Sequence, residues 1–157
     1  MTTAIRKATP GDIPALVDLM REFYAEAGYP LDRGWAAAAF SALLGDDSRG
    51  AAWLVSHGGE PAGYVVLTVR FSMEYGGLDA FIDDLFVRPA HRRLGLGRAA
   101  LREIFDECGR RGVLAVHVEV GRDNAAALAL YSDYGLESGG DGRQTLTARL
   151  GESPGDA

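Results

Sequence analysis

The feature that most constrains this fold lies near residue 90, where a strand pattern changes into a basic loop and then into a helix. Residues 80–87 are rich in the aromatic and branched side chains of a strand, and Pro89 closes it. Apolar side chains then recur at helical spacing: Leu96, Ala100, Leu101, Ile104, Phe105 and Cys108. A strand pattern over 113–120 follows, so the sequence predicts a βαβ crossover here.

The segments around this crossover predict an α/β (α+β) fold with a mixed, mostly antiparallel, twisted sheet and helices on both faces. The hairpin composition of residues 57–60 makes the flanking strands antiparallel. The expected elements are strand 5–8, helices 13–24 and 35–44, strands 52–56, 63–71 and 80–87, helix 97–108, strand 113–120, helix 124–134 and strand 144–150. Their order is therefore β-α-α-β-β-β-α-β-α-β.

The length of 157 residues and the apolar share of 47% suit one domain, which we expect over residues 1–150. The tail 151–157 is rich in Gly, Pro and acid, so we expect it to be disordered. The chain contains no apolar run of the roughly 18 residues that a membrane helix needs, and its first residues do not resemble a secretory signal. Cys108 is the single cysteine, which excludes an internal disulfide. A cytoplasmic protein without membrane contact is the expectation.

The formal charge of -6 argues against a nucleic-acid partner, because neutralising phosphates needs a surplus of Lys and Arg. It suits a cationic substrate. The histidines His57, His91 and His117 are too scattered in the sequence to indicate a metal site. Dimers are the commonest oligomers, so a homodimer is the default expectation for the assembly.

The loop after the strand has the composition of a phosphate site. Gly95 and Gly97 allow close approach of an anion to the main chain, and the first turn of a helix offers unpaired N–H groups. Arg92, Arg93 and Arg98 add positive charge for a ligand with several phosphates. Glycines at a helix start are also common in plain tight turns, and surface arginines are often only solvated.

Two linked segments resemble motifs of the GCN5-related N-acetyltransferase (GNAT) family. Residues 92–97, Arg-Arg-Leu-Gly-Leu-Gly, resemble its Arg/Gln-x-x-Gly-x-Gly/Ala motif. Residues 124–136 resemble its Asn-x-x-Ala-x-x-Leu-Tyr-x-x-x-Gly-Phe helix, and the likeness of motifs and element order covers nearly the whole chain. Two departures are Arg93, where Gly is common, and Leu136, where Phe is usual; neither removes a main-chain amide.

The resemblance implies acetyl-CoA as cosubstrate and assigns its contacts. Main-chain amides would hold the pyrophosphate at Leu94, Gly95, Leu96, Gly97 and Arg98. The pantetheine arm would pair, as an added strand does, with the main chain of Phe86, Val87 and Arg88. Asn124 would also contact the cofactor.

The reaction needs a free amine, yet at neutral pH only about one primary amine in a few thousand is deprotonated. The family commonly uses an acid on the strand before the phosphate loop, where this chain has Asp83 and Asp84. Asp83 matches the position that diamine acetyltransferases use, so we expect it to be the base, with Asp84 binding the amine or acting instead. Because neighbouring strand residues face opposite ways, only one would point at the substrate directly. The plain alternative is two charges at a strand end, bonded to a loop or an arginine.

Tyr131 lies seven residues after Asn124, so both side chains share one helical face. The resemblance implies that Tyr131 is the general acid that protonates the leaving thiolate. Without the resemblance, a packing role would be the commoner one for a helix tyrosine. The sequence therefore offers one candidate acid for the reaction.

Aromatic and acidic residues elsewhere suggest an acceptor site for a small cationic amine. Tyr24, Tyr29 and Trp35 lie in the first helical region, and Glu74 and Tyr75 precede the third long strand. Each of them can equally be structural. Polyamines, aminoglycosides, amino acids and protein N-termini all remain open as acceptors.

Two other functions fit parts of the sequence. Gly95, Gly97 and Ala100 match a dinucleotide-binding fingerprint with Glu119 as its acid, but the preceding strand ends too early and too little chain follows. A non-catalytic acyl-CoA sensor would keep the loop and need neither Tyr131 nor the acids. Their presence favours an enzyme.

Overall fold

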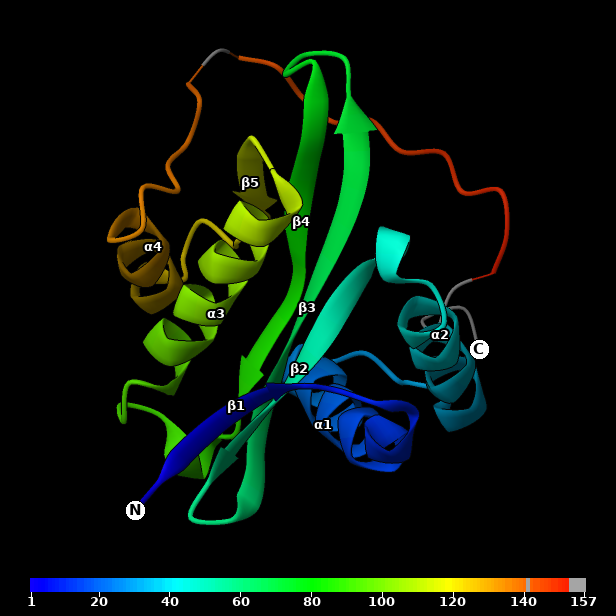
Figure 1. The fold of residues 1–157 in the computed structure, drawn as a ribbon, viewed down its shortest axis with the longest axis vertical. Coiled ribbons are helices and arrows are strands. Elements are labelled where there is room, and N and C mark those ends of the chain that lie inside the picture. Colours follow the sequence, from blue (N-terminus) through cyan, green and yellow to red (C-terminus); the bar gives the residue numbers. More distant parts are fainter. Residues whose placement is uncertain (141, 153–157) are drawn as a thin grey trace.

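The computed structural model describes residues 1–140 and 142–152, and its centre is one five-stranded sheet (Figure 1). The strands are β1 (Thr3–Lys7), β2 (Gly50–His57), β3 (Glu60–Ser72), β4 (Gly77–Val87) and β5 (Ala115–Val118), and they lie side by side in chain order. Neighbours are antiparallel except β4 and β5, which are parallel. This confirms the mixed, mostly antiparallel sheet and excludes the all-parallel sheet of a dinucleotide-binding fold.

Helices cover both faces of the sheet, as the pattern predicted (Figure 1). On one face, α1 (Ile13–Glu26) and α2 (Arg33–Leu44) enclose one apolar core; on the other, α3 (Leu96–Arg111) and α4 (Ala125–Ser132) help to enclose a second. Short 3-10 turns occupy residues 10–12, 47–49 and 89–91. Within the described residues, none of the helices is long and apolar enough to cross a membrane.

Local chemistry sets the helix ends. Gly95 before α3 and Gly112 after it both adopt left-handed backbone, which glycine tolerates best. The Asp32 side chain accepts a hydrogen bond from the Trp35 amide at 2.7 Å and so caps α2. The Asn124 side chain does the same for α4, through the Ala127 amide at 3.1 Å.

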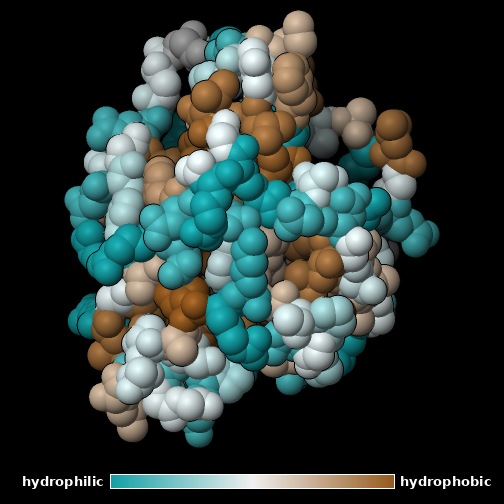
Figure 2. Space-filling view, viewed as in Figure 1, coloured by the Kyte–Doolittle hydropathy of each residue, from teal (hydrophilic) through white to brown (hydrophobic). Residues whose placement is uncertain are grey.

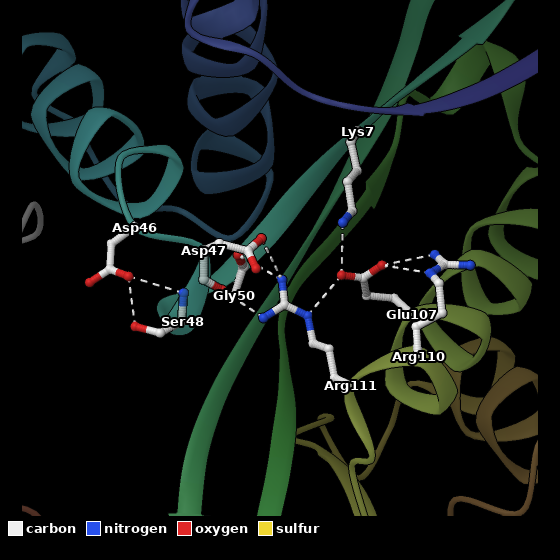
Figure 3. Close-up of polar contacts among 8 residues, drawn as sticks. All are labelled: Lys7, Asp46, Asp47, Ser48, Gly50, Glu107, Arg110 and Arg111. Carbon is white, nitrogen blue, oxygen red and sulfur yellow. Dashed lines mark hydrogen bonds and ion pairs between the residues drawn. The ribbon is translucent and has the colours of Figure 1, made fainter.

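A buried carboxylate ties three segments together (Figure 3). Glu107 on α3 is 3% exposed, and it accepts hydrogen bonds from Lys7 on β1, Arg110 and Arg111. Arg111 also reaches the segment before β2, through the carbonyl oxygen and carboxylate of Asp47. Because every charge in this cluster is matched, it fastens the edge of the sheet to α3.

The end of the chain differs from the prediction. The expected strand 144–150 is wrong, because these residues form no strand and are all exposed, with Leu146 86% and Leu150 99% accessible. The preceding strand is also shorter than the expected 113–120, since only Ala115–Val118 pair with β4. A strand pattern becomes a strand only where a neighbour offers its main chain. The expected tail at 151–157 lies outside the described residues from 153 onward.

Candidate active site

The parallel strands β4 and β5 separate after a short contact. Their pairing runs from Asp79 with Ala115 to Ile82 with Val118, and residues 83–87 of β4 continue without β5 beside them. The side chains of Leu85 and Val87 line a cavity of about 670 Å³ that α3 and α4 close. The open end of β4 therefore forms one wall of a cavity whose other walls are helices.

The segment predicted to hold the pantetheine arm lies only partly on this cavity. Val87 lines it, but the Phe86 side chain is 3% exposed and packs in the core against α1, with its ring centroid 5.4 Å from that of Phe23. Strand alternation is the reason, because Leu85 and Val87 face α3 and α4 while the residue between them faces the other side of the sheet. The contact predicted for Phe86 uses main-chain atoms alone, so the burial of its ring does not contradict that prediction.

The loop at the start of α3 fits a phosphate group. Arg93 and Gly95 both have positive φ, 65° and 79°, a left-handed geometry that occurs in main-chain concavities that bind anions. The first N–H groups of α3 have no acceptor within the helix. A side chain at Gly97 would lie 3.1 Å from the Leu130 side chain, so a glycine lets α3 and α4 come close. The predicted residues Arg92, Arg93, Gly95, Leu96, Gly97 and Arg98 all line the cavity.

The arginines of this region are held by acids on neighbouring helices. Arg92 donates to the Val87 carbonyl at 2.9 Å and pairs with Glu26 of α1 at 2.8 Å. Arg88 pairs with Glu22 of the same helix at 2.7 Å. These contacts link α1 to the phosphate loop.

Three other predicted contacts have different outcomes. Arg98 pairs with Asp133 just beyond α4 and still lines the cavity. Leu94 is 53% exposed and is not among the lining residues. The Oδ1 atom of Asn124 caps α4, and Asn124 lines neither of the two cavities described here. The helical spacing of Asn124 and Tyr131 did not reveal this, because a cap residue stands outside the helix that it starts.

Tyr131 lies where two cavities meet. It is 7% exposed, and it lines both the first cavity and a second one of about 1070 Å³ beside β5. Burial raises the pKa of its phenol, so the hydroxyl keeps its proton at neutral pH. A protonated hydroxyl at this junction can donate a proton.

A β-bulge places both predicted acids near one another on the open stretch of β4. Leu67 of β3 pairs with Ile82, and Val66, the residue before Leu67, pairs with Asp84. Asp83 therefore has no partner on β3 and is the extra residue of the bulge. The bulge resets the alternation of the strand. The strict alternation expected from the sequence therefore does not hold at this pair.

The surroundings of the two acids raise their pKa values. Asp84 is half-buried and accepts a hydrogen bond from the Tyr64 hydroxyl at 2.9 Å. Burial raises the pKa of Asp84, the hydrogen bond from Tyr64 lowers it, and the charge of Asp83 raises it further. The resulting pKa of Asp84 is about 6. Desolvation and then the charge of Glu119 raise the pKa of Asp83. Within the described residues, no Lys or Arg forms an ion pair with either acid.

The predicted acceptor residues lie in separate parts of the molecule. Tyr24 on α1 lies close enough to Asp84 and Asp83 that, after burial, their charges raise its pKa. Tyr75 lines the second cavity and its ring lies 5.9 Å from His117. Tyr29 is 62% exposed, and Glu74 pairs with Arg143 at 3.2 Å. Trp35, 38% exposed, sits at the start of α2.

Several residues near the site were missed by sequence reasoning. Tyr64 was hidden in a strand pattern, and only the pairing of β3 with β4 brings it to Asp84. Asp79 is fully buried and accepts hydrogen bonds from Arg70 at 2.8 Å and His117 at 2.9 Å. Glu119, which the sequence offered as a ribose acid, follows β5, and its charge raises the pKa of Asp83.

Comparisons with known proteins point in one direction. The acetyltransferase (GNAT) family model matches residues 13–136. The [ribosomal protein bS18]-alanine N-acetyltransferase of Escherichia coli strain K12 is 30% identical over 125 residues, covering 80% of this chain and 74% of the relative. A crystal structure of the integron cassette protein HFX_CASS3, from the mobile metagenome of Cole Harbour Salt Marsh, is 46% identical, with a TM-score of 0.86 and coverage of 96% of this chain and 92% of that one. The ribosomal-protein-alanine N-acetyltransferase of Brucella melitensis shares the fold, with a TM-score of 0.71 at 18% identity over 95% of this chain and all of that one.

Proposed function

The chain belongs to the GNAT acetyltransferase family of acyl-CoA-dependent N-acyltransferases, and from that premise we propose that it moves an acetyl group from acetyl-CoA to a primary amine on a small cationic molecule. One observation carries the proposal. The first cavity brings the glycine loop and Tyr131 together, and Tyr131 also borders the second cavity, which Glu119 lines. Asp83, whose pKa the charge of Glu119 raises, and Asp84 follow the last residue of β4 that pairs with β5 and lie outside the lining of both cavities.

In this proposal the cosubstrate supplies the acetyl group and a thiolate leaving group. The main-chain N–H groups of residues 94–98 and the side chains of Arg92, Arg93 and Arg98 hold its pyrophosphate. The left-handed geometry of Arg93 and Gly95 supports this binding. The absence of a side chain at Gly97, which lets the Leu130 side chain approach closely, also supports it. The main chain of residues 86–88 pairs with the pantetheine arm, and the place of Val87 on the cavity wall supports this path.

Asp83 takes the proton from the ammonium group, directly or through water, and Asp84 orients the amine. Asp83 is the more exposed of the two, and its raised pKa brings its basicity closer to the working pH. The Tyr64 hydroxyl holds Asp84 in one orientation. With Glu119 and the half-buried Tyr24 nearby, the region is negative and aromatic, which favours a cation.

Tyr131 donates its hydroxyl proton to the departing thiolate. Its position on both cavities supports this role. No other tyrosine of the described chain lines the first cavity. The proton that Asp83 accepts and the one that Tyr131 gives balance over the cycle.

A protein N-terminal amine is the second candidate acceptor. The names of the E. coli and Brucella relatives describe ribosomal-protein-alanine acetylation, which favours it. The acids above bind either kind of cation. Which class of amine reacts is therefore the question for experiment.

The test has two stages. Calorimetry with acetyl-CoA and CoA should show binding, and thiol release should then rise with one class of amine in a panel of polyamines, aminoglycosides, amino acids and an Ala-starting peptide. Mass spectrometry of the product should show one added acetyl group. Binding without any acetylated amine would instead favour the acyl-CoA sensor, and no binding at millimolar cosubstrate would overturn the proposal.

Tyr131→Phe separates catalysis from binding. We expect turnover to fall roughly 100-fold with the dissociation constant of CoA unchanged within about twofold. Tyr134→Phe is the matched control, since Tyr134 follows α4, donates to the Arg98 carbonyl at 3.1 Å and lies outside both cavities. An equal loss in both variants would argue against Tyr131 as the acid.

A further inference from the structure

Asp79 is a fully buried carboxylate that the proposed reaction does not use. It lies near the start of β4 and is 0% exposed. Arg70, its partner on β3, donates from Nε to Oδ1 at 2.8 Å and from Nη2 to Oδ2 at 3.0 Å. The Nε2 atom of His117 on β5 lies 2.9 Å from Oδ2. Three adjacent strands thus meet in one polar cluster, Arg70, Asp79 and His117.

The carboxylate of Asp79 sets the tautomer of His117. The hydrogen bonds from Arg70 lower the pKa of Asp79 against the effect of burial, so the carboxylate is ionised at neutral pH and can only accept. The proton between the two side chains therefore belongs to Nε2 of His117, and in a neutral imidazole the lone pair is left on Nδ1. His117 offers a hydrogen-bond acceptor, and Asp79 keeps it in that form.

Neighbouring rings fix the orientation of the imidazole. The ring centroid of Phe81 on β4 lies 4.8 Å from that of His117, and the ring centroid of Tyr75 lies 5.9 Å from it. The Arg70 guanidinium packs on the same Phe81 ring, 5.0 Å from its centroid. The His117 side chain is nevertheless 31% exposed. An imidazole that is both held and accessible can bind a ligand with little further loss of conformational freedom.

The cluster lies on the same face of the sheet as the Asp84 carboxylate of the proposed site. Arg70 and Tyr64 are an even number of residues apart on β3, so their side chains point to one face. The Tyr64 hydroxyl donates to Asp84, and the Arg70 guanidinium donates to Asp79. Both carboxylates therefore reach that face.

His117 is a short step along the strands from the proposed base. It pairs with Phe81, and Asp83 follows Phe81 by two residues on β4, a step of roughly 7 Å. Glu119 follows His117 by two residues, and its charge raises the pKa of Asp83. An amine bound at Asp83 can therefore extend a second group to His117.

The charges favour a hydrogen-bond donor over an anion as this second group. Asp79 balances the charge of Arg70, so the cluster carries no net charge while the imidazole is neutral. The nearby carboxylate of Glu119 repels an anion and attracts a donor. A free lone pair on Nδ1 can accept from such a donor and from nothing else.

Hydrophobic surface lies at the same end of the molecule. Phe71 and Met73, near the turn between β3 and β4, are 64% and 88% exposed, and Leu114 before β5 is 60% exposed. Figure 2 shows apolar surface gathered at the upper end of the molecule in this view, where that turn lies in Figure 1. A hydrogen bond is electrostatically stronger in apolar surroundings than in water, so a single one here can discriminate between ligands.

We propose that His117 selects acceptors that carry a second hydrogen-bond donor roughly 7 Å from the amine that is acetylated. Its Nδ1 atom accepts that hydrogen bond, and Asp79 and Arg70 are positioning residues that fix the tautomer and the ring. The preferred acceptor is then a small bifunctional amine, in contrast to a simple alkylamine or an amino acid. This inference rests on the proposed function and adds a contact that the acetyl transfer itself does not require.

Three acceptors of equal length test the contact. Hexylamine, 1,5-diaminopentane and 5-aminopentanoate place a methyl group, an ammonium group and a carboxylate oxygen at the same distance from the reacting amine. Measured by thiol release, kcat/KM should be about tenfold higher for the diamine than for hexylamine, of which a factor of about two reflects its second reactive end. In His117→Phe this ratio should fall to about two. His57→Phe is the matched control, since His57 lies at the end of β2 and contacts Thr3, and it should keep the ratio of the parent.

The outcomes separate this inference from the proposed function. A ratio near two in the parent, a ratio that survives in His117→Phe, or a preference for the carboxylate would overturn the role of His117 alone. If none of the three amines is acetylated, the proposal of a small-molecule acceptor fails together with this inference.

Nitrogen NMR of the imidazole gives a readout that does not depend on activity. The parent should show His117 with its proton on Nε2 and a bare Nδ1, in a signal identified by its loss in His117→Phe. Asp79→Leu replaces the buried carboxylate by an apolar group of similar shape, and Arg70, 60% exposed, can turn to water. We then expect both tautomers and a diamine preference reduced about threefold or more, with circular dichroism confirming the fold. A proton on Nδ1 in the parent, or an unchanged tautomer and preference in Asp79→Leu, would contradict the positioning role.

Discussion

Glu107 and Asp84 are carboxylates withdrawn from water on opposite faces of the same sheet, yet their surroundings shift their pKa values in opposite directions. At Glu107, burial alone would raise the pKa, but hydrogen bonds from Lys7, Arg110 and Arg111 outweigh it and lower the pKa to about 2. At Asp84, burial is opposed only by one neutral hydroxyl, and the pKa rises to about 6.

The difference separates a structural charge from a charge kept for a ligand. The Glu107 cluster is complete, so it needs nothing from outside the chain and joins β1, α3 and the segment before β2. The group formed by Asp83, Asp84 and Glu119 lacks a Lys or Arg partner among the described residues, and a bound cation would complete it. Burial alone would not distinguish the Glu107 cluster from this group of acids. The presence or absence of Lys and Arg partners distinguishes them.

Removing the Glu107 charge should have the largest effect. Glu107→Gln leaves two arginines and a lysine facing a neutral amide, so we expect the free energy of unfolding to fall by about 3 kcal/mol, more than 100-fold in the folding equilibrium. Urea unfolding measures it, and Lys7→Met, which removes one exposed partner, is the milder control. Turnover per folded molecule should stay at the parent level, and an unchanged urea midpoint would show that the cluster is not structural.

Removing the unpaired acids should have its main effect on activity. Under the proposed function, Asp83→Asn should lower kcat roughly 100-fold, because the amine loses its base. Asp84→Asn should act mainly on KM for the amine, by about tenfold. Steady-state kinetics of the two variants against one acceptor make the comparison, and identical patterns in kcat and KM would remove the distinction between base and amine-orienting residue.

The two carboxylates should also give opposite pH dependences of stability. Since the folded pKa of Asp84 is raised from 3.8 to about 6, the folded state holds the proton longer, and stability is lost as pH rises through this window, by roughly 1–2 kcal/mol. The folded pKa of Glu107 is lowered from 4.5 to about 2, so its contribution is present above pH 4.5 and lost as pH falls toward 2. Urea unfolding of the parent and of Asp84→Asn at pH 4.5 and 7.5 checks the first sign. A parent that gains stability relative to Asp84→Asn as pH rises would reverse our assignment.

The smallest effect should come from the pair that links α1 to the phosphate loop. Glu26→Gln frees Arg92 for an anion, and we expect CoA to bind about threefold more tightly in calorimetry. Asp18→Asn is the matched control, because Asp18 lies on the same helix and pairs with Arg33, away from the loop. Weaker binding in Glu26→Gln alone would mean that the pair positions the loop and does not compete with the ligand.

Sequence reasoning succeeded where structure is local. The glycine loop, the helix after it and the hairpin strands were all predicted, because turn chemistry and side-chain periodicity act over a few residues. It failed where distant segments meet. The bulge at Asp83 depends on the register with β3, and Tyr64 reaches Asp84 only through that register. The sequence also did not show that the ring of Phe86 belongs to the core against α1.

The last strand and the cap show the same limit. Residues 144–150 have a strand pattern, but a sequence pattern does not show whether a neighbouring strand is in place to pair with it. Asn124 was matched to a motif, and the structure adds that its Oδ1 atom caps α4 through the Ala127 amide.

The separation of β4 from β5 after Ile82 leaves a site with two halves, the glycine loop and the acids. The first half is built mainly from main-chain atoms and the second from side chains. In the proposed function, main-chain amides bind the cosubstrate on the loop side, so we expect that half to tolerate most side-chain substitutions. On the acid side, recognition rests on a few replaceable carboxylates. A lineage built on this scaffold could therefore change its acceptor by one or two substitutions while leaving its acyl donor untouched.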